Sequence, residues 1–155
     1  MRQGPRLGVD VGKARVGLAR CDREGLLATP VDTLDRTTAV SEIQRVAADM
    51  DLLEVVVGLP LALSGQETAS TQDAKEFAAD LAATLAMPVR MVDERLSTVQ
   101  ATQSLHQAGR LAKKQKAVID QVAAVILLQH ALDAERYQGV PPGYLVQPEE
   151  MTYGQ

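Results

Sequence analysis

Residues 53–60 read LEVVVGLP, and the centre of this segment is an uninterrupted run of valines. A strand with one face in water alternates apolar and polar residues, whereas a strand covered on both faces is apolar throughout. The run therefore predicts a strand inside a sheet that carries helices on both of its faces. Such a sheet indicates an α/β fold.

The order of the other segments agrees with this arrangement. Before the valine run, glycines and the turn sequence CDREG separate three short apolar segments, which predict an antiparallel meander. After it, helical apolar periodicity alternates with one more strand. We predict a mixed five-stranded sheet, an antiparallel meander plus parallel strands, with helices on both faces. The predicted strands are 7–11, 16–20, 26–29, 53–60 and 89–94, and the predicted helices are 38–50, 67–85, 97–108 and 117–137.

Length and composition limit the remaining possibilities. A chain of 155 residues fits one domain, which we place at residues 1–138, followed by an irregular tail at 139–155. The single cysteine, Cys21, cannot form an internal disulfide, and no signal peptide or membrane-spanning run is visible, so we expect a cytoplasmic protein. A net charge of −4 argues against a protein that coats nucleic acid by bulk attraction.

Four acids lie at the ends of predicted elements. Asp10 interrupts the apolar segment LGVDVGKARVGLA, Asp93 and Glu94 close the last strand, and Asp120 lies in the first turn of the last helix. Because side chains alternate along a strand, only one of Asp93 and Glu94 can face a given side of the sheet. Several carboxylates in one place are what hard divalent cations require. Two such ions roughly 3.5–4 Å apart can activate water and stabilise the leaving oxygen of a phosphodiester.

Each acid also has a simpler interpretation. Asp10 would only cap the turn that follows it, and Asp93, Glu94 and Arg95 would form a solvated charge cluster after a strand. Asp120 would interact with the positive end of a helix dipole, which is worth roughly 0.3–1 kcal/mol. The joint placement of the acids is better evidence than any one of them.

Basic residues gather near the last helix and in the first turn region. The segment GRLAKKQK carries four cations and no acid just before the helix that bears Asp120, and Arg15 follows the first predicted strand. Such a run is often only a solvated loop, but here it would lie beside the acids, where a phosphate backbone could run. Aromatic residues are 3% of the chain, so base stacking would contribute little. The four cations are Arg110, Lys113, Lys114 and Lys116.

The chain resembles the YqgF/RuvX family in four segments, which occur in the family's order between residue 7 and about residue 133. They are LGVDVGKARVGLA, VVGLPLALSGQETA, VDERLST and IDQVAAVILLQHAL. The resemblance implies a ribonuclease H-like fold and a nuclease that acts on four-way (Holliday) DNA junctions or on the 5′ end of pre-16S rRNA.

The resemblance also implies roles for particular residues. The family's acids correspond to Asp10, Glu94 and Asp120, which would hold Mg²⁺ or Mn²⁺, with Asp93 as a neighbouring catalytic candidate. The loop of Ser64, Gly65 and Gln66 would approach the substrate, since glycine permits close backbone contact. The candidates for binding nucleic acid are Lys13, Arg15, Arg95, Arg110, Lys113, Lys114 and Lys116.

Two other classes of function remain open at this point. One is a non-catalytic RNA-binding or ribosome-associated module that keeps the fold, and the other is an actin-like nucleotide-binding protein, whose first phosphate loop also reads D-x-G after a strand. A junction resolvase would act as a symmetric homodimer because it cuts two related strands, whereas a monomer suffices to trim an RNA end. No dimer seam is evident in the sequence.

Overall fold

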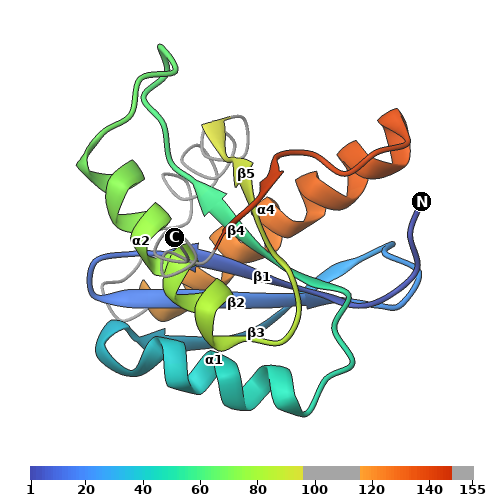
Figure 1. Ribbon diagram of the computed structural model, residues 1–155, viewed down its shortest axis with the longest axis horizontal. Helices are drawn as coiled ribbons and strands as arrows, with labels where there is room; N and C mark the ends of the chain where they lie inside the picture. Colours follow the sequence, from blue (N-terminus) through green and yellow to red (C-terminus); the bar gives the residue numbers. More distant parts are fainter. Residues whose placement is uncertain (96–115, 148–155) are drawn as a thin grey trace, which may run out of the picture.

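The computed structural model describes residues 1–95 and 116–147. Within these residues a six-stranded sheet forms the centre of the molecule, in the order β3-β2-β1-β4-β5-β6 (Figure 1). The strands are β1 (Arg6–Val11), β2 (Arg15–Cys21), β3 (Ala28–Asp35), β4 (Glu54–Leu59), β5 (Val89–Asp93) and β6 (Tyr144–Leu145). The helices are η1 (Arg36–Thr38), α1 (Ala39–Ala48), α2 (Ala69–Thr84) and α4 (Lys116–Gln138).

The sheet is mixed, as the sequence predicts. Strands β1, β2 and β3 form an antiparallel meander, and β4 and β5 continue the sheet parallel to β1. The sixth strand, β6, was not predicted and pairs antiparallel with β5. It lies within the segment 139–155 that we expected to be irregular. Gly143 precedes it with φ of +76°, and a Cβ there would overlap the carbonyl oxygen of Met91, so glycine is required at this turn.

The boundaries of β3 differ most from the prediction. The predicted strand 26–29 begins instead at Ala28 and runs to Asp35. Leu26 and Leu27 belong to the preceding turn because their amides donate hydrogen bonds of 2.9 and 3.0 Å to the carboxylate of Asp22. The strand lies at the sheet edge and is largely exposed, so it lacks the apolar pattern that marks the other strands. The predicted helix 97–108 lies outside the described residues.

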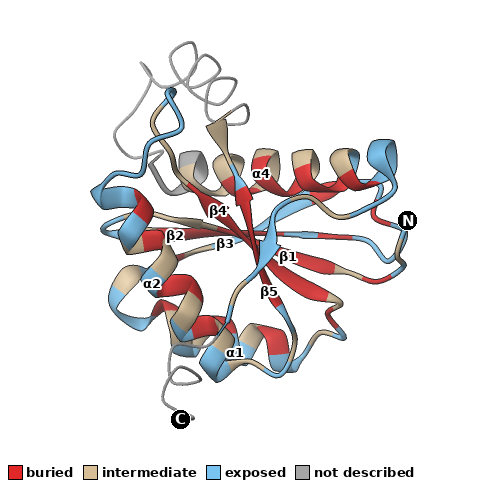
Figure 2. Cartoon of the chain, turned by 45° about the horizontal axis from the view of Figure 1, so that its top comes forward, coloured by how far each residue is buried: buried red, intermediate tan, exposed pale blue. Residues whose placement is uncertain are grey.

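Helices cover both faces of the sheet, and each face has its own apolar core. On one side α1 and α2 pack against alternate residues of the strands, including Val55 and Val57 of β4. On the other side α4 packs against the residues between them, including Val56. Figure 2 shows buried residues along the strands of the sheet and on the helices that cover it. This double coverage explains the uninterrupted valine run of β4.

Two glycines allow α4 to lie directly on the sheet. A Cβ at Gly8 of β1 would lie 2.8 Å from Cβ of Leu128, and a Cβ at Gly17 of β2 would overlap the backbone carbonyl of Asp120. Gly17 lies inside β2, within the strand that the sequence predicts at 16–20. Any larger residue at these two positions would force α4 away from the strands.

None of the helices in the described segments is long and apolar enough to cross a membrane.

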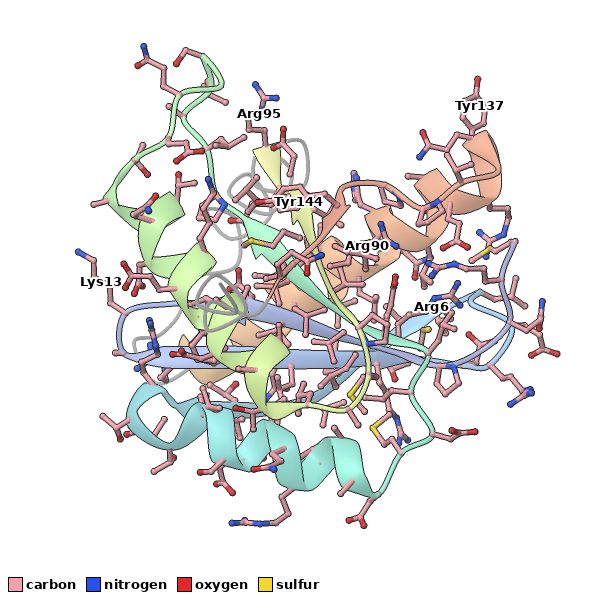
Figure 3. All side chains as sticks on the ribbon, viewed as in Figure 1. Arg6, Lys13, Arg90, Arg95, Tyr137 and Tyr144 are labelled. Carbon is pink, nitrogen blue, oxygen red and sulfur yellow. The ribbon has the colours of Figure 1, made fainter. Side chains whose placement is uncertain are left out.

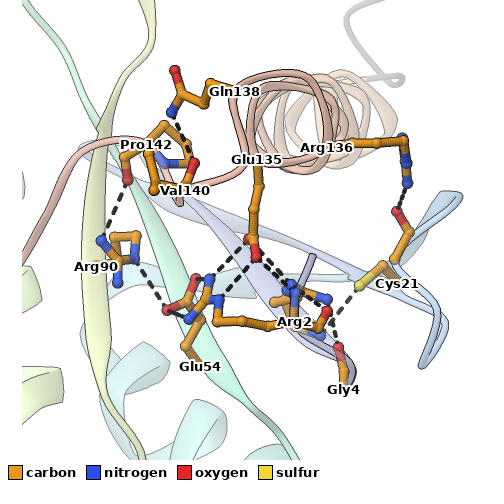
Figure 4. A network of polar contacts seen from close by, with 12 residues as sticks. Arg2, Gly4, Cys21, Glu54, Arg90, Glu135, Arg136, Gln138, Val140 and Pro142 are labelled. Atoms are coloured by element: carbon orange, nitrogen blue, oxygen red, sulfur yellow. Dashed lines mark hydrogen bonds and ion pairs between the residues drawn. The ribbon is translucent and has the colours of Figure 1, made fainter.

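The far end of α4 is fixed by a network of buried ion pairs (Figure 4). Glu135 of α4 accepts from Arg2 at 2.9 Å and from Arg6 at 3.2 Å. Glu54 of β4 accepts from Arg2 at 3.0 Å and from Arg90 of β5 at 3.1 Å. The hydrogen bonds from Arg2 lower the pKa of Glu135 to about 2. The network joins the N-terminus, three strands and α4.

We predict that Glu135→Gln lowers the free energy of unfolding at pH 7 by about 3 kcal/mol, because removing one partner leaves a buried charge uncompensated. The folded-state pKa of Glu135 lies below its ordinary value of 4.5, so the stabilisation is complete above pH 4.5 and is lost as the pH falls towards 2. Urea unfolding at pH 7 and pH 3 should show the difference between the two proteins shrinking at the lower pH.

The matched control is Glu42→Gln, because Glu42 pairs with Arg45 on the surface of α1. That change should alter stability by less than about 1 kcal/mol at either pH. Equal effects of the two substitutions would contradict the structural role assigned to Glu135.

Candidate active site

Asp10 lies on β1 with its side chain on the α4 face of the sheet. Leu7 and Val9 belong to the opposite core, so Gly8 and Asp10 alternate with them and face α4. Burial, together with the nearby negative charge of Asp120, raises the pKa of Asp10 to about 6. The environment of Asp10 therefore disfavours the ionised form of its carboxyl group.

Asp120 reaches the same place from α4. Its backbone lies against Gly17, and Gly17 is paired with Asp10 across β1 and β2. Its carboxylate oxygen Oδ2 accepts a hydrogen bond of 2.8 Å from Nε of Arg15, the first residue of β2. Two acids that are 110 residues apart in the sequence thus come together where α4 crosses the meander.

Glu94 joins this face, and Asp93 does not. The backbone amide of Glu94 donates to the carbonyl of Leu59, and a Cβ at Gly58 of β4 would overlap its carboxylate oxygen Oε2. Val9 pairs with Val57 across β1 and β4, so Gly58 lies level with Asp10. The carboxylate of Glu94 therefore lies over β4, on the side of the sheet that α4 covers.

Asp93 instead forms an exposed ion pair with Arg95, at 2.6 Å. The hydrogen bond from the Arg95 side chain holds the pKa of Asp93 below its ordinary value. The sequence alone left Asp93 and Glu94 as alternatives. The position of β5 in the sheet distinguishes the two acids. Side chains alternate along the strand, so Glu94 faces the same side as Val92, which packs on the α4 side, and Asp93 faces the other side.

The three acids that share the α4 face do not form a finished metal site in this conformation. Among residues 1–95 and 116–147, no three side chains of Asp, Glu, His or Cys are arranged so that they could hold one metal ion. Asp120 is bound to Arg15 instead. The structure therefore brings Asp10, Glu94 and Asp120 to one end of one face, with a guanidinium beside them.

Other predicted cations lie at the same end of the sheet. Lys13 is exposed at the tip of the β1–β2 turn, and Arg95 follows β5 (Figure 3). The loop after β4 approaches Arg95, since a Cβ at Gly65 would lie 3.3 Å from its Nη1 atom. Lys116 begins α4. The predicted residues Arg110, Lys113 and Lys114 lie outside the described segments.

Arg36 is a positioning residue that the sequence analysis missed. Its Nη1 atom donates 2.9 Å hydrogen bonds to the carbonyl of Gly12 and to Asp73 of α2, and its guanidinium lies 5.0 Å from the ring centre of Phe77. These contacts fix the β1–β2 turn, which carries Lys13, against α2. An arginine just after an edge strand gave no sequence signal for this role.

Comparison with known proteins identifies the family. Residues 4–134 match the model of the RuvX family, which is described as a Holliday junction resolvase. The chain belongs to the RuvX family. This confirms the resemblance drawn from the four sequence segments.

Relatives of the chain carry the name "Putative pre-16S rRNA nuclease". One from Clavibacter michiganensis subsp. michiganensis is 61% identical over 150 residues, which cover 94% of this chain and 93% of the relative. Another from Leifsonia xyli subsp. xyli is 51% identical over 151 residues, with 96% and 97% covered. The match extends over nearly the whole of each protein.

Among solved structures, Thermus thermophilus RuvC in complex with a Holliday junction substrate superposes with a TM-score of 0.53. The match has 16% sequence identity and covers 92% of this chain and 99% of that one. At this identity the likeness concerns the fold, and it confirms the predicted ribonuclease H-like architecture.

We predict that Asp10→Asn stabilises the metal-free protein at alkaline pH. The folded-state pKa of Asp10 is about 6 against an ordinary 3.8, so its ionisation costs stability between these values and the full cost remains above pH 6. In EDTA at pH 8 the variant should unfold with a free energy about 1–3 kcal/mol higher than the wild type. At pH 4 the gain should disappear.

Asp93→Asn serves as the comparison, because Arg95 lowers the pKa of that carboxyl and removing its charge offers no relief. This variant should not be more stable than the wild type at pH 8. A loss of stability in Asp10→Asn at pH 8 would contradict the electrostatic description of the site.

Proposed function

We propose that this RuvX-family protein is a divalent-metal-dependent endonuclease that hydrolyses phosphodiester bonds of structured nucleic acid. The observation that carries the proposal is the meeting of Asp10, Glu94 and Asp120 on one face of the sheet, from β1, the end of β5 and α4. Membership in the RuvX family supports the nuclease class over a nucleotide-binding protein of the actin-like kind.

The donor chemistry of these residues fits Mg²⁺ or Mn²⁺. Nucleases related to RuvC and RuvX generally depend on divalent metal ions. Carboxylate oxygens are the ligands that hard cations prefer, and three of them would come from Asp10, Glu94 and Asp120. When bound, such an ion activates water and stabilises negative charge on the phosphate. The arrangement would close around an ion once Asp120 exchanges its bond to Arg15 for a metal ligand bond.

The protein's own cations would hold the substrate. Lys13, Arg15 and Arg95 lie around the acids at the same end of the sheet, and guanidinium groups bind phosphate oxygens in a fixed geometry. Arg36 would keep the β1–β2 turn in place while Lys13 and Arg15 contact the backbone. Arg110, Lys113, Lys114 and Lys116 would extend this surface. Recognition would depend on backbone and shape, because aromatic residues are scarce.

Two substrates are compatible with this site. The names of the close relatives favour the 5′ end of pre-16S rRNA, and the family description favours a four-way DNA junction. A junction resolvase requires a symmetric dimer, whereas trimming of an RNA end does not. A cytoplasmic location, expected from the sequence, is compatible with either substrate.

The decisive experiment offers both substrates to the purified protein with Mg²⁺ or Mn²⁺. Paired symmetric nicks in the junction would identify a resolvase, and a defined RNA end without junction cleavage would identify a processing nuclease. Asp10→Asn and Glu94→Gln should lower the cleavage rate by about 100-fold or more, since even partners of metal ligands contribute 10–100-fold. Asp93→Asn should retain most of the activity, because its side chain pairs with Arg95.

Binding without cleavage of either substrate by the wild type, with both metals tested, would instead favour the non-catalytic RNA-binding module. Equal losses in Asp93→Asn and Glu94→Gln would show that the position of Glu94 over Gly58 does not determine its role.

We also predict that Gly58→Ala impairs cleavage more than folding. A Cβ at this position would overlap Oε2 of Glu94, a movable side-chain atom, so the carboxylate must leave its place over β4. Gly4→Ala is the control, because its Cβ would meet Cβ of Leu53 at 2.9 Å, before β1 begins and away from the acids. Thermal melting and cleavage rates should show Gly4→Ala losing more stability and Gly58→Ala losing more activity. The reverse ranking would contradict this assignment.

A further inference from the structure

The ion pair between Arg15 and Asp120 lies where the proposed metal ligands meet. Nε of Arg15 is 2.8 Å from Oδ2 of Asp120, and the two side chains are 39% and 25% exposed. The pair is thus open to solvent on one side, while Asp10, next to Asp120, is half-buried. A guanidinium here neutralises one of two neighbouring acids.

The backbone that carries Arg15 is firmly held. The amide of Gly12 donates to the carbonyl of Arg15 at 2.9 Å, and the amide of Arg36 donates to the carbonyl of Ala14 at 3.0 Å. The side chain of Arg36 bonds to Gly12 as well, and Asp73 holds that side chain on α2. Exchange of partners by Arg15 therefore needs only rotation of its side chain and no movement of the hairpin.

From this geometry we infer that Arg15 is an exchangeable internal counter-ion of the active site. In the metal-free protein its guanidinium is paired with the carboxylate of Asp120, and a divalent ion that binds Asp120 must displace it. Once displaced, its guanidinium is available to a phosphate of the substrate. The inference rests on the proposed function.

The exchange couples metal binding to nucleic-acid binding. Metal binding frees Arg15 for phosphate, and phosphate binding draws Arg15 away from Asp120 and so favours the metal. Because the coupling is a free energy between two sites, each ligand must raise the affinity for the other by the same factor. A guanidinium suits both partners, since its fork of donors matches carboxylate and phosphate oxygens alike.

The test compares Mn²⁺ binding by isothermal titration in the wild type, Arg15→Gln and Arg95→Gln, with no nucleic acid present. Arg15→Gln should bind Mn²⁺ about two- to fivefold more tightly than the wild type, the scale of one solvent-exposed ion pair. Arg95→Gln removes an arginine from the comparable exposed pair with Asp93, at 2.6 Å. It controls for the general effect of losing one positive charge near the acids, and its Mn²⁺ affinity should change less.

A second measurement follows the affinity for a labelled four-way junction and a pre-rRNA fragment in EDTA and in Ca²⁺. For each nucleic acid, the affinity in Ca²⁺ divided by the affinity in EDTA should be larger for the wild type than for Arg15→Gln. Only the wild type has an arginine at position 15 to release.

Unchanged or weaker Mn²⁺ binding by Arg15→Gln, or an equal rise in Arg95→Gln, overturns the counter-ion role and leaves the nuclease proposal standing. Absence of Mn²⁺ binding in all three folded proteins overturns both. Tighter binding by Arg15→Gln together with a reduced Ca²⁺ effect on nucleic acid supports the exchange.

Discussion

The close contact between α4 and the sheet is the constraint on which the rest of this structure depends. Gly8 and Gly17 remove the side chains that would hold the helix away, and the backbone of Asp120 consequently lies against β2. Without that approach the second core would not close over β1 and β4, and Asp120 would not lie near Asp10. One packing contact therefore serves both the stability of the domain and the assembly of its acids.

Near the two ends of α4, carboxyl groups have pKa values that are shifted in opposite directions. At one end Glu135 accepts hydrogen bonds from two arginines, and its pKa falls to about 2. At the other end Asp10 is desolvated beside a second acid, and its pKa rises to about 6. The first arrangement stabilises the fold. The second leaves a cost in the metal-free protein that a bound cation would relieve, which is a common relation between stability and function at active sites.

Much of the fold follows from the sequence, because the valine run of β4 and the helical periodicity around it have a direct physical meaning. The parts that do not follow are instructive. Strand β3 lies at an exposed edge, where no burial imposes an apolar pattern, and β6 is only two residues long. The choice between Asp93 and Glu94 was open because β5 is covered on both faces, so its sequence carries no alternation that assigns a side.

The roles of Gly58 and Arg36 also could not be predicted, for a related reason. Each depends on a contact between residues far apart in the sequence: Gly58 with Glu94, and Arg36 with both Gly12 and Asp73. A glycine inside an apolar strand signals that something approaches closely, but the identity of that neighbour comes only from the register of the sheet.

The charge distribution is consistent with a protein whose contact with nucleic acid is local. The chain carries a net charge of −4, so attraction to a polyanion cannot be spread over its surface. Lys13, Arg15 and Arg95 instead lie at the sheet end where the acids meet, and two of them are already paired with carboxylates. Arg15 in particular attracts phosphate weakly until its partner, Asp120, is occupied by another positive charge. Productive binding to the backbone would then be strongest when the acids hold metal, which limits unproductive contact with other polyanions.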